Sequence, residues 1–156
     1  MRTLPIIALI PTLAGPLAAQ EVTRHRIPGS DFPIAAAVEV PPGATMVHLS
    51  GAVPPMRLGG PGDTRAQTRG VLEAIEAQLR RLELSMGDVV RMQVFLVGDA
   101  ARGGRMDFAG FMEAYREFFG TPAQPNLPIR SVVQVAGLAN PDWLVEIEVS
   151  AVRPRR

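Results

Sequence analysis

Short runs of alternating apolar and polar residues predict strands along most of the chain. The predicted strands cover residues 35–40, 45–50, 89–97, 131–135 and 144–152, with a further candidate near 22–27. A Pro-Pro-Gly turn at 41–43 separates the first two. The run at 89–97 alternates most regularly and is the strongest of these predictions.

Two other segments repeat apolar residues at helical spacing. From Thr64 to Leu84 an apolar stripe is flanked by Arg and Glu, which predicts a helix lying on a sheet. Thr64 and Gln67 have the spacing of a capping box at its start. From Phe108 to Phe118, aromatic residues and Met112 share one face, which we interpret as core packing, and a Gly-Thr-Pro sequence ends this helix.

This order of strands and helices predicts an α+β fold with both helices packed on one face of a sheet. On the last strand, apolar residues alternate with Glu146 and Glu148, so one face is apolar and the other acidic. Gln134 would join the acidic face if its strand pairs with the last one. Such a face either contacts water or lines a subunit interface, and spacing alone does not decide between them.

The composition fits one small globular domain and excludes several chemistries. The chain has 156 residues, and its 16 basic residues, all arginine, balance 15 acidic ones to a net charge of +1, which does not favour a nucleic-acid partner. The sequence contains neither Cys nor Lys, which excludes thiol nucleophiles, disulfides and Schiff-base lysines. His25 and His48 lack the spacing of a triad or a metal pair, and we interpret them as ordinary strand residues.

Residues 1–19 have the features of a secretory signal peptide. Arg2 precedes an apolar run, and small residues before Gln20 fit a cleavage site. An uncleaved membrane anchor is the alternative, but the run is shorter than the roughly 20 residues of a spanning helix and contains prolines. We therefore expect a single domain over residues 20–156 that is exported, in the bacterial periplasm, without stable membrane insertion after cleavage.

Several segments, taken in order, carry a resemblance to a known family. They are Leu49-Ser50-Gly51, Ala66-Gln67-Thr68, residues 87–96, Tyr115 with Phe118-Phe119, residues 128–136 and residues 145–149. Together they resemble the RidA/YjgF family from about residue 31 to residue 153. The resemblance implies a chorismate-mutase-like fold with a mixed sheet, a barrel-like homotrimer, and ligand sites between the subunits.

The activity that this resemblance implies is the hydrolysis of 2-imino and enamino acids. Members of the family deaminate small reactive intermediates such as 2-iminobutanoate and 2-iminopropanoate to 2-keto acids and ammonia. We accordingly expect a small carboxylate metabolite as substrate, self-association as the main partnership, and neither a metal nor an organic cofactor.

Two residues match the positions at which the family carries its chemistry. Arg130 stands where the family has a carboxylate-binding arginine, and a guanidinium can hold a carboxylate through two hydrogen bonds. Glu146 aligns with an acidic residue that positions or activates the attacking water. The alternatives are an Arg that is solvated or paired with an acid, and a solvated acidic stripe formed by Glu146 and Glu148.

Ser50, Gly51 and Ile34 are further candidates for the substrate-binding cleft. Ser50 and Gly51 are equally compatible with the plain end of a strand. Ile34 stands where deaminases of the family usually have a tyrosine, so an aliphatic side chain would shape the pocket there. Met112 replaces a usual asparagine and Val132 a frequent cysteine, which suggests a shifted or relaxed substrate range.

The leading hypothesis is a hydrolase for 2-imino acids in which Arg130 and Glu146 carry the chemistry. The alternative is a non-catalytic trimeric binding protein for a small carboxylate metabolite, because an exported protein would not meet the intermediates that cytoplasmic enzymes produce. A related deamination or a ring-opening hydrolysis is a weaker third option.

Overall fold

The central sheet has four strands in the order β3-β6-β4-β5. The structure is a computed structural model that describes residues 21–55 and 62–154, so the predicted signal peptide at residues 1–19 lies outside the described residues. The four strands are β3 (Thr45–Ala52), β4 (Val89–Val97), β5 (Ile129–Val135) and β6 (Val145–Arg153). The sheet is mixed, because β6 pairs antiparallel with β3 and β4 whereas β4 and β5 are parallel.

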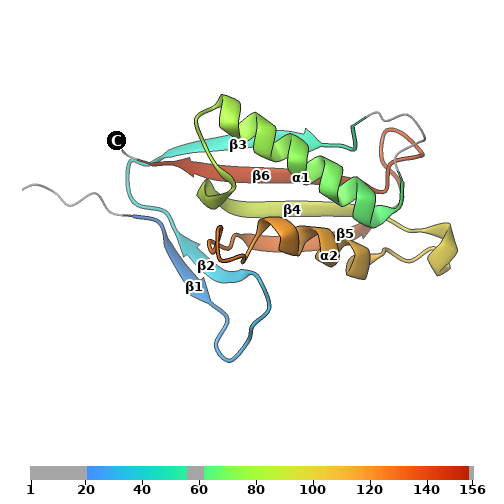
Figure 1. Cartoon of the computed structure of the whole chain (residues 1–156), viewed down its shortest axis with the longest axis horizontal. Coiled ribbons are helices and arrows are strands. Elements are labelled where there is room, and N and C mark those ends of the chain that lie inside the picture. Colours follow the sequence, from blue (N-terminus) through green and yellow to red (C-terminus); the bar gives the residue numbers. More distant parts are fainter. Residues whose placement is uncertain (1–20, 56–61, 155–156) are drawn as a thin grey trace, which may run out of the picture.

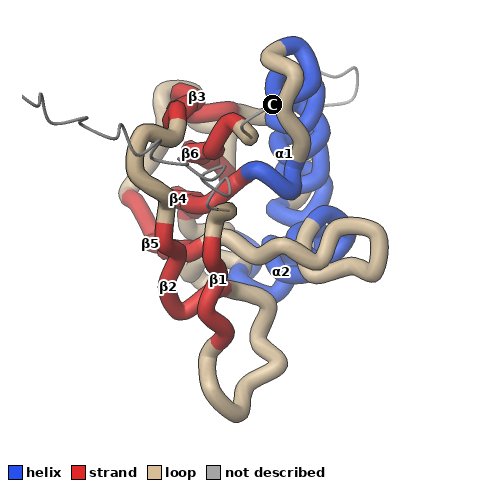
Figure 2. The backbone as a smooth tube through the Cα atoms, turned by 90° about the vertical axis from the view of Figure 1, so that its left-hand side faces the viewer, coloured by secondary structure: helices blue, strands red, loops and turns tan. Residues whose placement is uncertain are grey.

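Both helices, α1 (Thr64–Arg81) and α2 (Phe108–Phe118), cover the same face of this sheet (Figures 1 and 2). The regular alternation of the central strands determines which side chains meet them. On the helix side the sheet buries Met92, Val94, Leu96, Val145, Ile147 and Val149. The predicted α+β fold with two helices on one face is therefore confirmed.

The first two strands form a separate hairpin beside β5 (Figure 1). Strands β1 (Thr23–Arg26) and β2 (Ala35–Glu39) pair antiparallel, and the candidate strand near 22–27 corresponds to β1. The hairpin is joined to the main sheet where the backbone N–H of Ala35 donates to the carbonyl of Pro128, 3.0 Å away. This contact brings the loop before β2 to the start of β5.

The ends of α1 differ from the sequence prediction. Its N-cap is Asp63, whose carboxylate accepts a hydrogen bond from the backbone N–H of Ala66 at 2.8 Å, so the predicted capping box at Thr64 and Gln67 is wrong. The helix ends at Arg81 rather than near Leu84, because Glu83 adopts a left-handed φ of 57° that turns the chain out of the helix. Short 3-10 turns follow at Met86–Asp88 and Ala100–Arg102.

Gln67 links the start of α1 to the connection between β5 and β6. The residue is 1% exposed. Its Nε2 donates to the carbonyls of Gly62 and Asp142 at 2.9 and 3.0 Å, and its Oε1 accepts from the N–H of Leu144 at 2.7 Å. One buried amide therefore satisfies backbone groups from two distant segments.

The predicted place of Gln134 on the acidic face depended on pairing between β5 and β6. β5 pairs with β4 and not with β6, so the condition for that placement is not met. Its Oε1 accepts from the N–H of Met106, and its Nε2 donates to the carbonyl of Gly104, both at 2.9 Å. Gln134 thus fastens the loop before α2.

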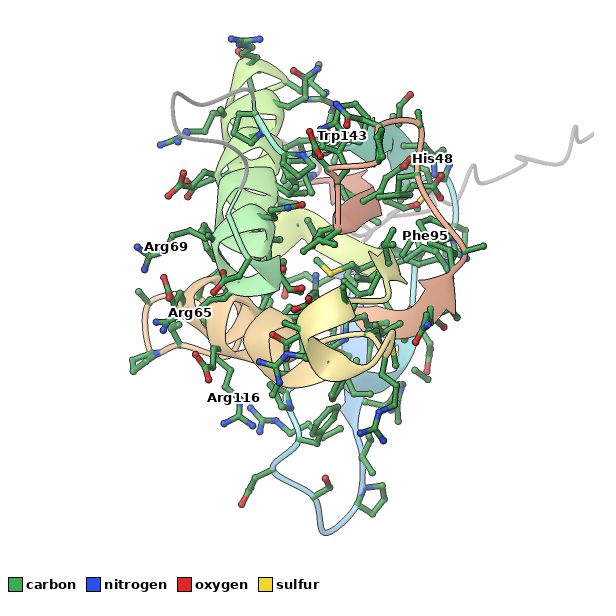
Figure 3. The ribbon with its side chains drawn as sticks, turned by 90° about the vertical axis from the view of Figure 1, so that its right-hand side faces the viewer. His48, Arg65, Arg69, Phe95, Arg116 and Trp143 are labelled. Atoms are coloured by element: carbon green, nitrogen blue, oxygen red, sulfur yellow. The ribbon has the colours of Figure 1, made fainter. Side chains whose placement is uncertain are left out.

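The face opposite the helices carries a mixed polar and apolar surface. In the register of β4 and β6, Phe95 lies beside Glu146 and Gln93 beside Glu148. Figure 3 labels Arg65 and Arg69 on the helix side, and His48 and Phe95 on the sheet side. Within the described ranges no helix has both the length and the apolar character needed to cross a membrane.

Replacing Gln67 with leucine should destabilise the protein by about 2–4 kcal/mol. The leucine side chain fills a similar volume but leaves the buried N–H of Leu144 and the carbonyl of Asp142 without their partner. The measurement is urea unfolding followed by the fluorescence of the single tryptophan, Trp143.

Gln78→Leu is the matched control, because Gln78 is exposed on the same helix. That change should alter the free energy of unfolding by no more than about 0.5 kcal/mol. Equal effects of the two substitutions would contradict the role assigned to Gln67.

Candidate functional site

Arg130 projects from the second position of β5 toward α2. It lies beside Met92 in the parallel register with β4, and Met92 is buried under the helices. The guanidinium carbon is 4.2 Å from the ring centroid of Tyr115 and 5.0 Å from that of Phe111. Phe32, from the loop before β2, lies 5.6 Å away. Three aromatic rings from two elements therefore hold one cation by cation–π contacts.

The hydrogen-bonding capacity of the Arg130 guanidinium is only partly used within the chain. Nη2 donates to the sulfur of Met112 at 3.2 Å, which is a weak acceptor. Nη1 is buried and has no hydrogen-bond partner among the described residues. Burial lowers the pKa of Arg130, although the neighbouring Tyr115 opposes this shift. A buried donor without a partner is costly, so the site is suited to receive an anion.

A pocket of about 350 Å³ adjoins Arg130. Its lining comes from the hairpin and from the starts of β4 and β5, and it includes the predicted site residue Ile34. This volume lies at the lower end of the range of about 300–1,000 Å³ for small-molecule sites. We call Arg130, its aromatic neighbours Phe32, Phe111 and Tyr115, and this pocket the arginine half-site.

Glu146, Ser50 and Gly51 form a second group, which we call the glutamate half-site. A Cβ added at Gly51 would collide with the carboxylate of Glu146, so these two residues are in direct contact across β3 and β6. Ser50 and Gly51 line a pocket of about 510 Å³ between β3 and α1. A break in the register of β3 between Leu49 and Ala52 places Gly51 there.

One chain does not bring Arg130 and Glu146 together. Glu146 alternates with the buried Val145 and Ile147, so it points to the face of the sheet opposite the helices, whereas Arg130 points to the helix face. The arginine half-site also lies at the β5 edge of the sheet, and Ser50 and Gly51 lie on β3 at the other edge. The predicted site residues thus fall into two groups.

The residues around Arg130 include Phe111 and Tyr115, which helical spacing predicts only as core residues, and Met112, which the family resemblance also links to the substrate range. Phe111, Met112 and Tyr115 do pack in the core, but each also contacts the guanidinium. Residues that only pack in the core and residues that also contact Arg130 occupy the same stripe of the helix. Helical spacing therefore cannot predict the contact with Arg130. Phe32, which is 37% exposed, precedes Ile34 in the loop before β2, where periodicity predicts no contact with Arg130.

The two histidines do not join either half-site through hydrogen bonds. His48 Nδ1 lies 2.9 Å from the hydroxyl of Ser150 on the neighbouring strand, and His25 Nε2 lies 2.7 Å from the carboxylate of Glu39 in the hairpin. Among residues 21–55 and 62–154, no group of three or more His, Cys, Asp or Glu is arranged to hold a metal ion.

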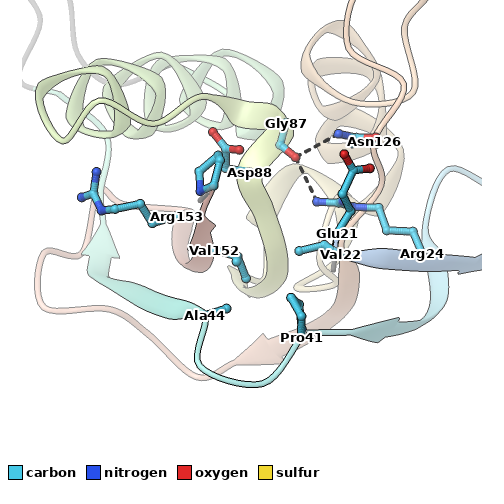
Figure 4. Close-up of a pocket in the computed structure, with 11 residues that line it drawn as sticks. Glu21, Val22, Arg24, Pro41, Ala44, Gly87, Asp88, Asn126, Val152 and Arg153 are labelled. Atoms are coloured by element: carbon cyan, nitrogen blue, oxygen red, sulfur yellow. Dashed lines mark hydrogen bonds between the residues drawn. The ribbon is translucent and has the colours of Figure 1, made fainter. Parts of the chain in front are cut away.

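A further pocket, of about 310 Å³, lies where β1 approaches the start of β4 (Figure 4). Arg24 donates through Nη2 to the carbonyls of Gly87 and Val89, at 2.9 and 3.3 Å, and Asn126 donates to the same Gly87 carbonyl at 3.1 Å. Burial lowers the pKa of Arg24, while the charge of Asp88 opposes this. These bonds fasten β1 to the turn before β4.

Tyr115 provides a direct test of the buried arginine half-site. Its hydroxyl donates to the carbonyl of Pro33 at 2.9 Å. Burial raises the pKa of Tyr115 to about 12, even though the nearby Arg130 cation favours the phenolate. Because Tyr115 is the only tyrosine, tyrosinate absorbance should titrate near pH 12 in the folded protein and near pH 10 in urea.

The same shift predicts how stability depends on pH. The folded state holds the Tyr115 proton more tightly than the unfolded state, so this contribution is complete below about pH 10 and is lost as the pH rises to about 12. A midpoint near pH 10 with the native circular dichroism retained would contradict the burial of Tyr115.

The chain is similar to several known proteins over most of its length. Residues 35–153 match the family described as Endoribonuclease L-PSP. TdcF of Escherichia coli K12 is 36% identical over 134 residues, which cover 85% of this chain and 95% of TdcF. The 2-iminobutanoate/2-iminopropanoate deaminase of the same organism is 37% identical over 110 residues, covering 69% of this chain and 80% of that protein.

Solved structures show the same arrangement of sheet and helices. The crystal structure of E. coli TdcF with bound serine has a TM-score of 0.59 at 34% identity, and the match covers 86% of this chain and 99% of that one. The structure of the E. coli YjgF gene product has a TM-score of 0.58 at 33% identity, with coverage of 81% and 93%. The predicted chorismate-mutase-like fold is confirmed, and the chain belongs to the endoribonuclease L-PSP family, the RidA/YjgF family that its sequence resembles.

Proposed function

We propose that this protein hydrolyses 2-imino acids, and their enamine tautomers, to 2-keto acids and ammonia. The observation that carries the proposal is the Arg130 guanidinium, which contacts three aromatic rings and has a buried Nη1 without a hydrogen-bond partner in the described part of the chain. A substrate carboxylate would supply the missing acceptor and the missing counter-charge together. Arg130 would therefore bind the substrate by the group that all 2-imino acids share.

The reaction needs one water molecule and proton transfer. Water adds to the imine carbon, the C–N bond breaks, and the nitrogen leaves as ammonia while the carbon keeps the water oxygen as a ketone. A carboxylate beside the imine can accept a proton from the water and return one to the leaving nitrogen. Glu146 is the candidate for this role, and its contact with Gly51 leaves no room for a side chain beside it.

Arg130 of one chain and Glu146 of a second chain would complete each site. The two half-sites lie at opposite edges and on opposite faces of the sheet, so one copy can present its arginine half-site to the glutamate half-site of the next. Such a head-to-tail contact repeats around a ring until it closes. We propose a closed homotrimer, following the family resemblance, with one site at each contact between subunits.

Two relatives support this proposal, one by its name and the other by the ligand bound in its structure. One is named a 2-iminobutanoate/2-iminopropanoate deaminase, and it is 37% identical over the matched residues. The structure of TdcF holds serine, a small amino acid whose carboxylate resembles that of a 2-imino acid.

The ribonuclease in the family description is not part of the proposal. RNA binding depends on many contacts between basic side chains and phosphates, and the net charge of this chain is +1. A small anionic metabolite fits the buried Arg130 guanidinium better than a polyanion does.

Export is a separate part of the proposal. The charged start, the apolar run and the small residues before Gln20 support a signal peptide over residues 1–19, with the mature domain in the periplasm. There the substrates would have to arise from deamination or amino-acid oxidation outside the cytoplasm.

The test is imine hydrolysis by the purified protein. An amino-acid oxidase with catalase generates the imine, and its loss and the formation of 2-keto acid are followed with and without the protein. Arg130→Ala should lower kcat/KM by about 100-fold or more, because it removes a charge-assisted bidentate contact. Glu146→Gln should lower kcat by about 100-fold or more while KM changes little.

Two matched variants serve as controls for this test. Arg80→Ala removes an exposed arginine of α1, and Glu148→Gln changes an exposed carboxylate two residues along the same face of β6. Both should retain most of the activity. No acceleration by the unmutated protein would contradict the proposed hydrolase and favour the binding-protein alternative.

A mixture of variants tests the shared site. Arg130→Ala and Glu146→Gln chains are inactive alone if both residues are needed. When they are unfolded, mixed in equal amounts and refolded together, about a quarter of the subunit contacts should hold both intact residues. Activity near this level is expected, and no recovery in a mixture shown to contain both chains would contradict a site made from two chains.

A further inference from the structure

The pocket beside Arg130 has a charged end and an aliphatic end. Its aliphatic lining on the hairpin side consists of Ile27, Ile34, Ala35 and Ala36. The hairpin that carries these residues meets the start of β5 at the Ala35–Pro128 hydrogen bond. A ligand whose carboxylate pairs with Arg130 would therefore place the rest of its length against branched hydrocarbon side chains.

We infer that the preferred substrates are 2-imino acids with branched or long apolar side chains, of the kind produced from leucine, isoleucine or methionine. The inference rests on the proposed function, because it assigns the part of the substrate that Arg130 does not hold. It makes Ile34 and Ile27 the specificity-determining residues of the site.

Size and polarity both lead to this assignment. A pocket of about 350 Å³ has room for a side chain larger than a methyl group. Each additional methylene that leaves water for a hydrocarbon surface strengthens binding, and in an enzyme pocket one such group changes kcat/KM by about 10-fold or more. A hydroxyl beside isoleucine loses its hydrogen bonds to water without replacement, so a serine-derived imine is disfavoured.

Ser131 and Arg91 also line this pocket, but they do not make its aliphatic part polar. Ser131 follows Arg130 on the strand and points to the opposite face of the sheet. Arg91 is exposed, and its Nη2 donates to Gln93 at 3.2 Å. Both polar groups thus belong to the side of the pocket away from the helices.

The test compares imines produced from leucine, alanine and serine by the same oxidase. With the unmutated protein, kcat/KM for the leucine-derived imine should exceed the value for the alanine-derived imine by about 10-fold or more. The serine-derived imine should be no better than the alanine-derived one. Equal or higher kcat/KM for the alanine- or serine-derived imine would overturn the inference.

Two substitutions test whether the aliphatic lining of the pocket, which we call the aliphatic wall, causes the preference for the leucine-derived imine. Ile34→Ser and Ile27→Ser should each lower the leucine-to-alanine ratio by about 10-fold, mainly through the leucine-derived imine. Val40→Ser is the control, because Val40 is 38% exposed and does not line the pocket; it should leave the ratio unchanged. If Ile34→Ser and Ile27→Ser both fold and both keep the leucine-to-alanine ratio of kcat/KM, the role of the aliphatic wall is overturned.

Binding of the products separates this inference from the proposed activity. Calorimetry with 4-methyl-2-oxopentanoate and with pyruvate needs no catalysis. Tighter binding of the branched acid by about 10-fold, lost in Ile34→Ser, would support the aliphatic wall even in a protein that accelerates no imine hydrolysis. Equal binding of the two acids by a protein that does hydrolyse imines would overturn the inference and leave the proposed function intact.

Discussion

The site depends on keeping the charged guanidinium of Arg130 under α2 without a neutralising carboxylate among residues 21–55 and 62–154. Arg130 loses hydration there, and the faces of Tyr115, Phe111 and Phe32 replace part of that stabilisation. An aspartate or glutamate at the same place would satisfy the charge but would also occupy the position that a ligand needs. The hydroxyl of Tyr115 is bonded to Pro33, so the ring contributes its face to the cation.

The alternation of side chains along β4, β5 and β6 has a second effect. It buries one face under the helices and at the same time sends Arg130 and Glu146 to opposite faces. A shift of one residue in either strand would reverse this, but it would also expose the core, so the placement is as firmly set as the core itself. The fold of each chain therefore already separates Arg130 from Glu146, and pairing of two copies would bring the Arg130 of one chain to the Glu146 of the other.

The sequence predicted what depends on local periodicity. The bounds of β4 and the presence of both helices follow from the spacing of apolar residues, and Arg130 and Glu146 were recognised through the family resemblance. It could not predict the bonds of Gln67 and Gln134, because their partners lie in segments far away in the chain. The double role of Tyr115 was hidden as well, since a core residue and a residue that contacts Arg130 occupy the same helical positions.

Gly51 and Glu146 constrain each other's evolution. The space that a side chain at position 51 would need is filled by the carboxylate, so the order in which these positions change matters. A lineage that keeps the glutamate in this orientation is limited to glycine at position 51, whereas one that first turns the carboxylate away or shortens residue 146 can then accept alanine or serine there. A larger residue at position 51 in a related sequence would therefore mark a protein in which this carboxylate has been lost or moved.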